Sequence, residues 1–365
     1  MAAEQSNKLG SHVEMKKVWE LLVIIVVTAI VWNLPTTCFG IDGLTVVQQR
    51  IIAIFVFATL SWLTECIPAW ATSLSIMSIM CVTVSKNSFW IFKGDGVGEL
   101  LDSEEIMASF ADPIIMLFLA GFILAIAASK SGLDTLLARN LIKPFGNKSE
   151  NVLLGFLLIT GLFSMFISNT ATAALMLTFL TPVFAALPAN GKGRIALTMS
   201  IPVAANLGGM GTPIGTPPNL IALKYLNDPA GLDMKIDFMH WMAFMAPLVI
   251  ILLLLSWRII LYFFPFTQKT IHLKIDGEVH RGWRMWVVII TFIVTILLWV
   301  IPKKVTGIDT NTVSMIPMAV FAITGVITAK DMQDINWSVI WMVAGGFAIG
   351  LGMNGSGLAD AAIES

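Results

Sequence analysis

The sequence predicts an all-α polytopic membrane protein, and its composition carries that prediction. Hydrophobic residues occupy 57% of the 365 positions and charged residues only 12%, whereas soluble domains usually contain about 25% charged residues. Several uncharged apolar runs approach the roughly 20 residues that a helix needs to cross a bilayer. A soluble protein of this composition would expose a very large apolar surface. The net charge of −1 leaves no basic face, so no nucleic-acid partner is expected.

The chain begins with a polar, mildly basic tail, residues 1–17, which we expect to be cytoplasmic. The apolar run after it is long and lacks a small-residue cleavage signature, which predicts a first membrane helix and not a cleaved signal peptide. An amphipathic stretch, Ser131–Pro144, is expected to lie along the membrane interface. The candidate membrane helices are Val18–Leu34, Val46–Leu63, Ile67–Val84, Ile114–Ala128, Phe238–Phe266, Trp283–Ile301, Val313–Thr328 and Val339–Met353.

The stretch Asn151–Gly191 contains no charged residue, and Ser168-Asn169-Thr170 divides it into two apolar halves. At about 1.5 Å per residue, each half would be about 25 Å long as a helix, which is short of the roughly 30 Å hydrocarbon core. Basic residues precede and follow the stretch, and such residues concentrate on the cytoplasmic side. We therefore predict a re-entrant helical hairpin with halves Val152–Ile167 and Ala171–Leu187 and a buried polar tip. The alternative is two short spans joined by a polar turn outside the membrane.

A second uncharged stretch, Ile195–Leu223, is expected to be a broken helix. It contains Gly208-Gly209-Met210-Gly211-Thr212-Pro213-Ile214-Gly215-Thr216-Pro217-Pro218-Asn219. Four glycines and three prolines are incompatible with a continuous α-helix. An uncharged break inside an apolar run is typical of the discontinuous membrane helices that form ion and substrate sites.

The distribution of charge predicts how the chain is oriented in the membrane. With the N-terminus inside, the basic loop Lys269–Arg284 is expected inside and the acidic segment Asn227–Asp237 outside. Lys303 and Lys304 fall on the predicted outer side. They are an exception to the rule that lysine and arginine concentrate on the cytoplasmic side.

Two short patterns predict an internal repeat. Phe118-Leu119-Ala120-Gly121-Phe122 leads to Ser131-Gly132-Leu133, and Met342-Val343-Ala344-Gly345-Gly346 leads to Ser356-Gly357-Leu358. The offset is about 225 residues, and inverted repeats are common in transporters. The counterpart of Ser168-Asn169-Thr170 would fall near position 393, beyond Ser365. We therefore expect a C-terminally truncated chain whose second repeat is incomplete.

The polar residues at the two breaks have the chemistry of a sodium site. Hard cations bind oxygen, and hydroxyl and carbonyl oxygens supply it without a buried charge, which costs about 3 kcal/mol in a membrane helix. Ser164 lies one turn before Ser168, so both hydroxyls face one side of a helix. Gly215 can offer its carbonyl from the broken helix.

An anion would bind at the same two breaks, at the N-terminal ends of the helices that begin there. Helix N-termini attract anions through free N–H groups and the helix dipole, and two half-helices are expected to begin here, after Thr170 and near Pro217. The side chains of Asn169, Thr170 and Thr216 add donors. Sodium beside the anion would raise its affinity, which gives a physical reason for coupling.

Two motifs in this order resemble the divalent anion/sodium symporter family: Ser-Asn-Thr in a charge-free stretch, then Gly-Thr-Pro-Pro-Asn in a broken helix. That family includes sodium/dicarboxylate, citrate and sulfate transporters. Trp62-Leu63-Thr64-Glu65-Cys66-Ile67-Pro68 also resembles a segment of that family, and the resemblance runs from about Val18 to Ser365. It implies an elevator-type transporter for small anions such as dicarboxylates or sulfate. It also implies co-transported Na⁺, no organic cofactor, and a homodimer in a lipid bilayer, expected to be the bacterial inner membrane.

The resemblance also implies residue roles and a division of the chain. Sodium would be held by Ser164, Ser168, Asn169 and the Gly215 carbonyl; substrate would touch Asn169, Thr170 and Thr216, with Pro217 shaping the loop. Scaffold helices and the interfacial helix would occupy 18–149, the transport part 150–265, and scaffold helices of the incomplete second repeat 266–365.

Other interpretations stay open at this point. Ser-Asn-Thr alone could be an interhelical hydrogen-bond contact, and Gly208-Gly209 could only permit close packing. Asn206 could serve packing or the substrate path. A sodium-independent dicarboxylate exchanger or a non-functional fragment are alternatives. A membrane enzyme is disfavoured, because none of the four histidines lies deep in an apolar run and no zinc-protease motif occurs.

Overall fold

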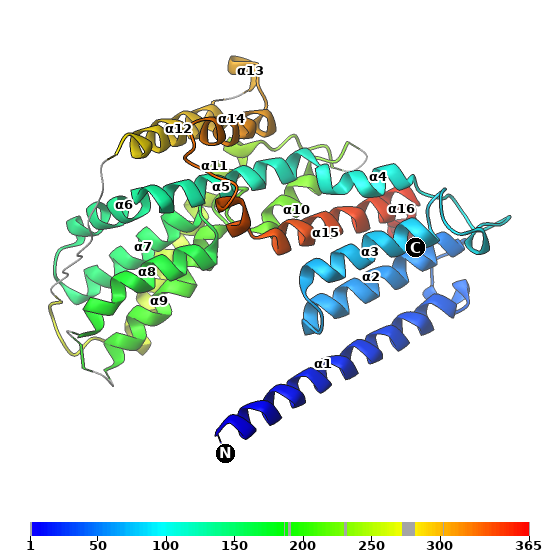
Figure 1. Cartoon of the computed structure of the whole chain (residues 1–365), viewed down its shortest axis with the longest axis horizontal. Helices are drawn as coiled ribbons and strands as arrows, with labels where there is room; N and C mark the ends of the chain where they lie inside the picture. Colours follow the sequence, from blue (N-terminus) through cyan, green and yellow to red (C-terminus); the bar gives the residue numbers. More distant parts are fainter. Residues whose placement is uncertain are drawn as a thin grey trace. The chain divides into compact units, whose positions relative to one another are not determined.

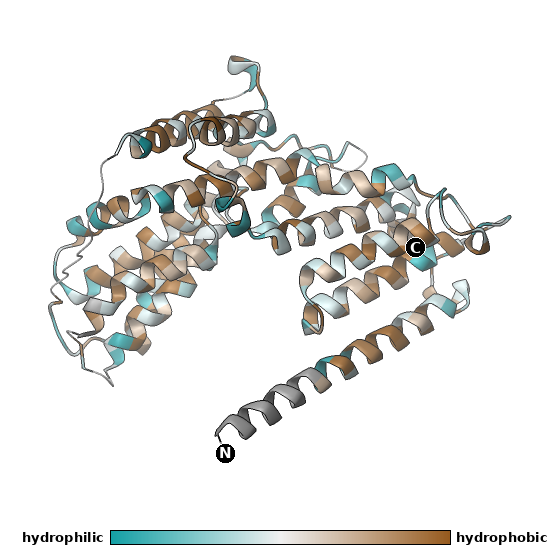
Figure 2. Ribbon diagram, viewed as in Figure 1, coloured by the Kyte–Doolittle hydropathy of each residue, from teal (hydrophilic) through white to brown (hydrophobic). Residues whose placement is uncertain are grey.

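The computed structural model describes residues 2–185, 187–188, 191–229, 232–271, 282–301 and 303–364. Over these residues the fold is helical, with only isolated β-bridges, which confirms the predicted all-α class (Figure 1). Among the described residues, five helical segments are long and apolar enough to cross a membrane: Val46–Thr64, Ser103–Ser131, Phe238–Phe263, Trp283–Val300 and Trp337–Gly355. Figure 2 shows apolar residues along most of these helices and many polar residues at helix ends and in connections.

The chain folds as two compact units, Met1–Ile115 with Asn336–Ser365, and Met116–Ile335. The first contains α1 (Ala2–Asn33), η1 (Thr36–Phe39), α2 (Val46–Thr64), α3 (Ala69–Thr83), η2 (Trp90–Phe92), α4 (Ser103–Ala108), η3 (Ser109–Ala111), α15 (Trp337–Gly355) and α16 (Leu358–Glu364). The second contains most of α5 (Pro113–Ser131), then α6 (Leu133–Ile142), η4 (Lys143–Phe145), α7 (Ser149–Ser164), α8 (Asn169–Ala185), α9 (Lys192–Gly209), α10 (Pro217–Leu226), α11 (Phe238–Phe263), α12 (Trp283–Val300), α13 (Lys303–Thr306), α14 (Thr310–Ile323) and η5 (Asp331–Asp334).

In the first unit, α15 packs against α3 and α2. A glycine permits the approach to α3, because a Cβ atom at Gly345 would lie only 2.6 Å from the Ser73 hydroxyl oxygen. At the C-terminal end of α15, Gln48 Nε2 donates a hydrogen bond to the Ser356 carbonyl at 2.8 Å. The middle and the C-terminal end of α15 are therefore held within this unit.

A buried arginine fixes the connections around α2. Arg50 is 9% exposed, and its Nη1 donates to the carbonyl oxygens of Thr83 at 3.1 Å and Phe92 at 2.9 Å. Its guanidinium also lies 5.7 and 5.0 Å from the ring centroids of Trp32 and Phe92, within the range of cation–π attraction. Arg50 thus joins the ends of α1 and α3 and the short helix η2 to α2.

The second unit is built around α7, α8, α9 and α11. α9 packs along α7 and also contacts α8 and α11, and Figure 1 shows α7, α8 and α9 side by side. The buried core comes from these helices and α6, and its largest fully buried side chains include Phe156 and Leu153. Backbone hydrogen bonds join Ser149 to Lys269 at 3.1 Å and Ile271 to Asn147 at 2.7 Å. Residues 150–265 therefore lie within one unit, with their two flanks paired.

Several helix ends differ from the predicted ones. α1 extends back to Ala2, through the predicted tail. α14 ends at Ile323, earlier than predicted, because Gly325 has a left-handed φ of 64° that stops the helix. α6 begins only after Gly132 within the predicted amphipathic stretch. Most of the predicted basic loop, residues 272–281, lies outside the described residues.

The two segments with similar sequence patterns also share local structure. α5 and α15 are both 19 residues long. Gly132 follows α5 and Gly357 ends the turn after α15, with left-handed φ values of 73° and 71°. A second helix begins at the next residue in each case, at Leu133 and Leu358. This shared geometry supports the predicted internal repeat.

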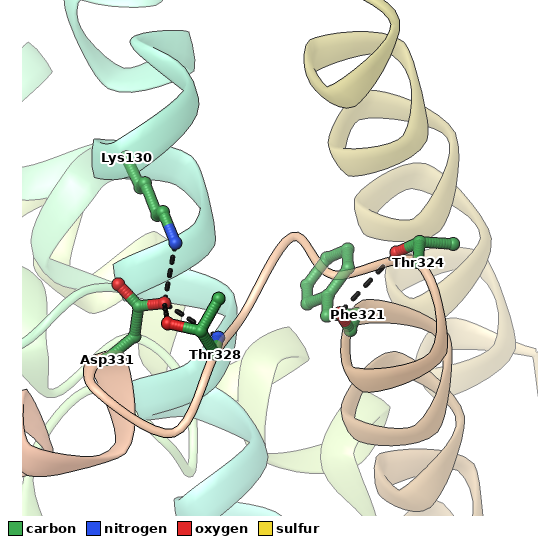
Figure 3. A network of polar contacts seen from close by, with 5 residues as sticks. All are labelled: Lys130, Phe321, Thr324, Thr328 and Asp331. Carbon is green, nitrogen blue, oxygen red and sulfur yellow. Dashed lines mark hydrogen bonds and ion pairs between the residues drawn. The ribbon is translucent and has the colours of Figure 1, made fainter.

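Figure 3 shows a polar contact that holds the segment after α14 onto the end of α5. Lys130 Nζ lies 2.5 Å from Asp331 Oδ2, and the same oxygen accepts hydrogen bonds from the backbone N–H (2.7 Å) and hydroxyl (2.5 Å) of Thr328. The hydrogen bonds from Lys130 and then Thr328 lower the pKa of Asp331 to about 2. The carboxylate therefore stays ionised and joins two distant parts of the sequence.

Candidate functional site

The first helix break lies between α7 and α8. α7 ends at Ser164 and α8 begins at Asn169. Ser168 caps α8, because its hydroxyl accepts a hydrogen bond from the Ala171 N–H at 3.3 Å, and a serine oxygen commonly satisfies a free N–H of the first turn. The predicted helix limits at this tip, Ile167 and Ala171, were therefore wrong, although the break itself is where the sequence predicted it.

Because of this cap, Asn169 and Thr170 lie in the first turn of α8. Their backbone N–H groups have no carbonyl acceptor four residues earlier within the helix. The positive end of the helix dipole lies at the same point. Asn169 is half-buried and Thr170 is exposed, so this turn can offer N–H and hydroxyl donors to an anion.

A cluster of uncharged oxygens surrounds the Ser164 hydroxyl. Ser164 is fully buried, and its Oγ lies 2.7 Å from both Asn169 Oδ1 and the Ala205 carbonyl oxygen. A hydroxyl has one proton, so it can satisfy only one of these acceptors at a time. The three oxygens come from α7, α8 and α9, and they suit a hard cation without a buried carboxylate.

Asn169 reaches from this cluster to the exposed side of α9. Its Nδ2 donates a hydrogen bond to Asn206 Oδ1 at 3.2 Å, and Asn206 is exposed. The sequence left the role of Asn206 open, and the structure places it in contact with a predicted site residue.

The second helix break separates α9, which ends at Gly209, from α10, which begins at Pro217. Asn219 stabilises it, because its Nδ2 donates to the carbonyl oxygens of Gly209 and Thr212, each at 2.8 Å. The Thr212 hydroxyl donates to the Met165 carbonyl, which fastens this break to the first one. The predicted interruption of this helix is confirmed.

Three glycines allow the two breaks to approach each other. A Cβ atom at Gly208 would lie 2.2 Å from the Gly161 carbonyl oxygen, so the backbones of α9 and α7 are in contact. A Cβ at Gly209 would lie 2.6 Å from Asn169 Oδ1, and one at Gly215 would lie 2.4 Å from the Gly209 carbonyl oxygen. Gly209 therefore contacts both Asn169 and Gly215, and close packing accounts for Gly208-Gly209.

The start of α10 differs from the predicted anion site in one respect. Its first residues are Pro217 and Pro218, which have no N–H group, so this helix end has fewer free donors than expected. Thr216 is the N-cap in extended backbone, and its side chain makes no capping hydrogen bond. Thr216 itself supplies the hydrogen-bond donors here. The positive end of the helix dipole adds a favourable charge for an anion. Thr216 and Pro217 are both half-buried.

Some contacts of the site could not be read from the residue types. Ala205 contributes a backbone carbonyl, which any residue would carry, so no sequence signal marks it. Thr212 lies within the glycine-rich break and Asn219 in the first turn of α10, and their polar character there was a usable signal for buried hydrogen bonds.

Comparisons with known proteins all find similarity to transporters. The chain matches the family described as citrate transporter (CitMHS) over residues 59–365. It is 31% identical over 377 residues to the sodium-dependent dicarboxylate transporter SdcS of Staphylococcus saprophyticus, covering 93% of this chain and 69% of that protein. For SdcS of Staphylococcus aureus strain USA300 the identity is 31% over 343 residues, with coverages of 85% and 63%.

A yeast protein extends the comparison to another anion. The chain is 29% identical over 348 residues to the inorganic phosphate transporter PHO87 of Saccharomyces cerevisiae. The match covers 94% of this chain but 36% of the yeast protein. The chain thus spans about two thirds of its bacterial relatives and about a third of this yeast relative.

Proposed function

The chain belongs to the citrate transporter family, and from this premise we propose that it takes part in sodium-coupled transport of a small divalent anion. The observation that carries the proposal is the uncharged oxygen cluster of Ser164, Asn169 and Ala205 beside the free donors of α8. Several helices long enough to cross a membrane and the transporter relatives favour a multi-pass transporter over an enzyme.

Asn169 explains how the two ions would be coupled. Its carbonyl oxygen faces the buried Ser164 hydroxyl, while its amide N–H group faces exposed Asn206. A cation at the carbonyl polarises the amide and strengthens its N–H donors on the other side. Each ion then binds more tightly when the other is present, because such coupling is reciprocal.

The proposed ligands follow from this arrangement. Sodium is bound by oxygens of Ser164, Ser168, Asn169 and the Gly215 carbonyl. The anion contacts Asn169, Thr170 and Thr216, and Pro217 shapes the start of α10. Na⁺ is the co-transported ion, and the site residues need no organic cofactor.

A dicarboxylate is the first candidate substrate. Neutral hydroxyl and amide donors suit a carboxylate, and two relatives carry the name sodium-dependent dicarboxylate transporter. Sulfate has the same divalent charge. Phosphate is a second candidate because the relative named as a phosphate transporter matches over nearly all of this chain.

We further propose an elevator mechanism, with residues 150–265 as the moving part and 18–149 and 266–365 as scaffold. The paired flanks of 150–265 support their movement as one body. The proposed assembly is a homodimer in the bacterial inner membrane, with the N-terminal tail, residues 1–17, in the cytoplasm.

Uptake into proteoliposomes tests this function. Labelled succinate, sulfate and phosphate are compared under inward gradients of sodium or of choline. Succinate uptake that requires sodium supports the proposal. Succinate uptake that is equal with sodium and with choline, and that is driven by succinate inside the proteoliposomes, would contradict sodium coupling. It would favour an exchanger. Absence of uptake and of binding for all three anions would contradict the assignment of an anion site.

A further inference from the structure

We infer that Asn206 is an anion-contacting and positioning residue, which presents a second side-chain amide beside Asn169. This inference rests on the proposed function, because an anion must bind at the start of α8 for Asn206 to meet it. The motifs that carry the family resemblance do not include Asn206.

The contacts around Asn169 run from the interior to the surface. Ser164 is fully buried, Asn169 is half-buried and Asn206 is exposed. Asn169 Oδ1 lies 2.7 Å from the Ser164 hydroxyl oxygen, and Asn169 Nδ2 lies 3.2 Å from Asn206 Oδ1. The amide of Asn169 therefore points its oxygen inward and its nitrogen outward.

Asn206 pairs with Asn169 in this orientation. An asparagine amide has an oxygen and a nitrogen of almost the same size, and its terminal torsion has two broad minima. In the flipped orientation, Asn169 Nδ2 would face the Ser164 hydroxyl, and the inward oxygen would be lost. In the arrangement that the structure shows, Asn206 Oδ1 accepts from Asn169 Nδ2, so the nitrogen of Asn169 lies outward and its oxygen faces the Ser164 hydroxyl, where a cation is proposed to bind.

Asn206 also has a donor group to offer. Its Oδ1 is used by Asn169, and its Nδ2 makes no hydrogen bond within the part of the chain that the structure describes. Asn206 belongs to α9 and Asn169 to α8. A carboxylate at this point would accept from amides of two different helices and would join their exposed sides. Both donors are neutral, so neither requires a buried charge in the absence of the anion.

The variants Asn206→Asp and Asn206→Ala separate this role from a purely structural one. Aspartate keeps an oxygen acceptor for Asn169 but replaces the free amide donor by a negative oxygen. We expect succinate affinity to fall at least tenfold in Asn206→Asp, while sodium still raises the unfolding temperature in the absence of succinate. Asn206→Ala should lower succinate affinity several-fold and should also weaken the stabilisation by sodium, because Asn169 is no longer held.

Thr198→Asp is the matched control. Thr198 is exposed on α9 about two turns earlier and bonds only within its own helix, so the same added charge should leave succinate affinity near that of the parent. Binding of labelled succinate by the purified chain, and its unfolding temperature with sodium or choline, are measured for all variants. Parent-like succinate affinity in either Asn206 variant would overturn the inference. A parent chain that binds no anion would instead overturn the proposed function, and the role of Asn206 with it.

Discussion

The hydroxyl of Thr212 donates a hydrogen bond to the backbone carbonyl of Met165, and this single bond joins the two helix breaks. Thr212 is fully buried, and Met165 directly follows the last residue of α7. The bond satisfies a carbonyl that the end of α7 leaves without a partner inside its helix. One side chain therefore fixes the loop between α9 and α10 against the tip where both ions are proposed to bind.

Replacing this hydroxyl by a methyl group should loosen the site. Thr212→Val keeps the shape of the side chain but removes the donor to the Met165 carbonyl, and loss of such a partner costs about 1–3 kcal/mol. We expect the unfolding temperature to fall by a few degrees and the sodium concentration for half-maximal succinate binding to rise. Thr212→Ser keeps the donor and is the control. A Val variant indistinguishable from the Ser variant would show that this bond does not fasten the two breaks.

The contact between α7 and α9 depends on the absence of a side chain at Gly208. In Gly208→Ala the new methyl group would lie 2.2 Å from the Gly161 carbonyl oxygen, so the two backbones must separate. We expect strongly reduced yield of folded protein and an unfolding temperature lowered by more than for Thr212→Val. Gly282→Ala is a suitable control, because no atom lies within 4 Å of a Cβ added there. Equal stability of the two alanine variants would argue against the close crossing.

Arg50 stabilises the first unit through donors and not only through its charge. Arg50→Met should leave the Thr83 and Phe92 carbonyls without their guanidinium partner, at a cost of about 1–3 kcal/mol. Arg50→Lys restores the charge but not the planar fork, so it should recover only part of the loss. Thermal unfolding of the purified chain measures both variants. Full recovery by lysine would mean that charge alone accounts for the effect.

The contact of Asp331 with Lys130 and Thr328 should depend on pH. The pKa of Asp331 in the folded chain, about 2, lies below the ordinary value of 3.8. The ionised carboxylate therefore stabilises the fold above about pH 4, and this contribution is lost as the pH falls toward 2. We expect Asp331→Asn to lower the unfolding temperature at pH 7 and to differ less from the parent at pH 3.

Asp334→Asn is the control for this pH effect, because Asp334 is an exposed residue of the same short helix. It should unfold like the parent at both values of pH. A constant difference between Asp331→Asn and the parent at pH 7 and pH 3 would contradict an ionised Asp331 as the source of stability.

The sequence was sufficient to place both breaks, because loss of charge together with glycine, proline and small polar residues leaves few structures possible inside a membrane. It was less reliable for helix ends. The cap at Ser168 moved the start of α8 to Asn169, and the two prolines removed donors that a generic helix start would have offered at α10.

The contacts between helices were not predictable from a single sequence. The packing of Gly208 on Gly161 and of Ser164 on the Ala205 carbonyl depends on how α9 crosses α7. That crossing is set by the packing of all the neighbouring helices. The meeting of Asn169 with Asn206 is a consequence of the same crossing, and so the sequence could only leave the role of Asn206 open.

Sodium-dependent anion binding by the Asn169→Ala variant tests the central claim most directly. Asn169 is the one residue assigned to both ions, and alanine removes the oxygen near Ser164 and the N–H donors near Asn206 together. Binding of labelled succinate is measured with sodium and with choline, alongside the parent and the Thr198→Asp control. The account predicts that Asn169→Ala expresses and folds but loses sodium-dependent succinate binding. Binding by Asn169→Ala equal to that of the parent would contradict it.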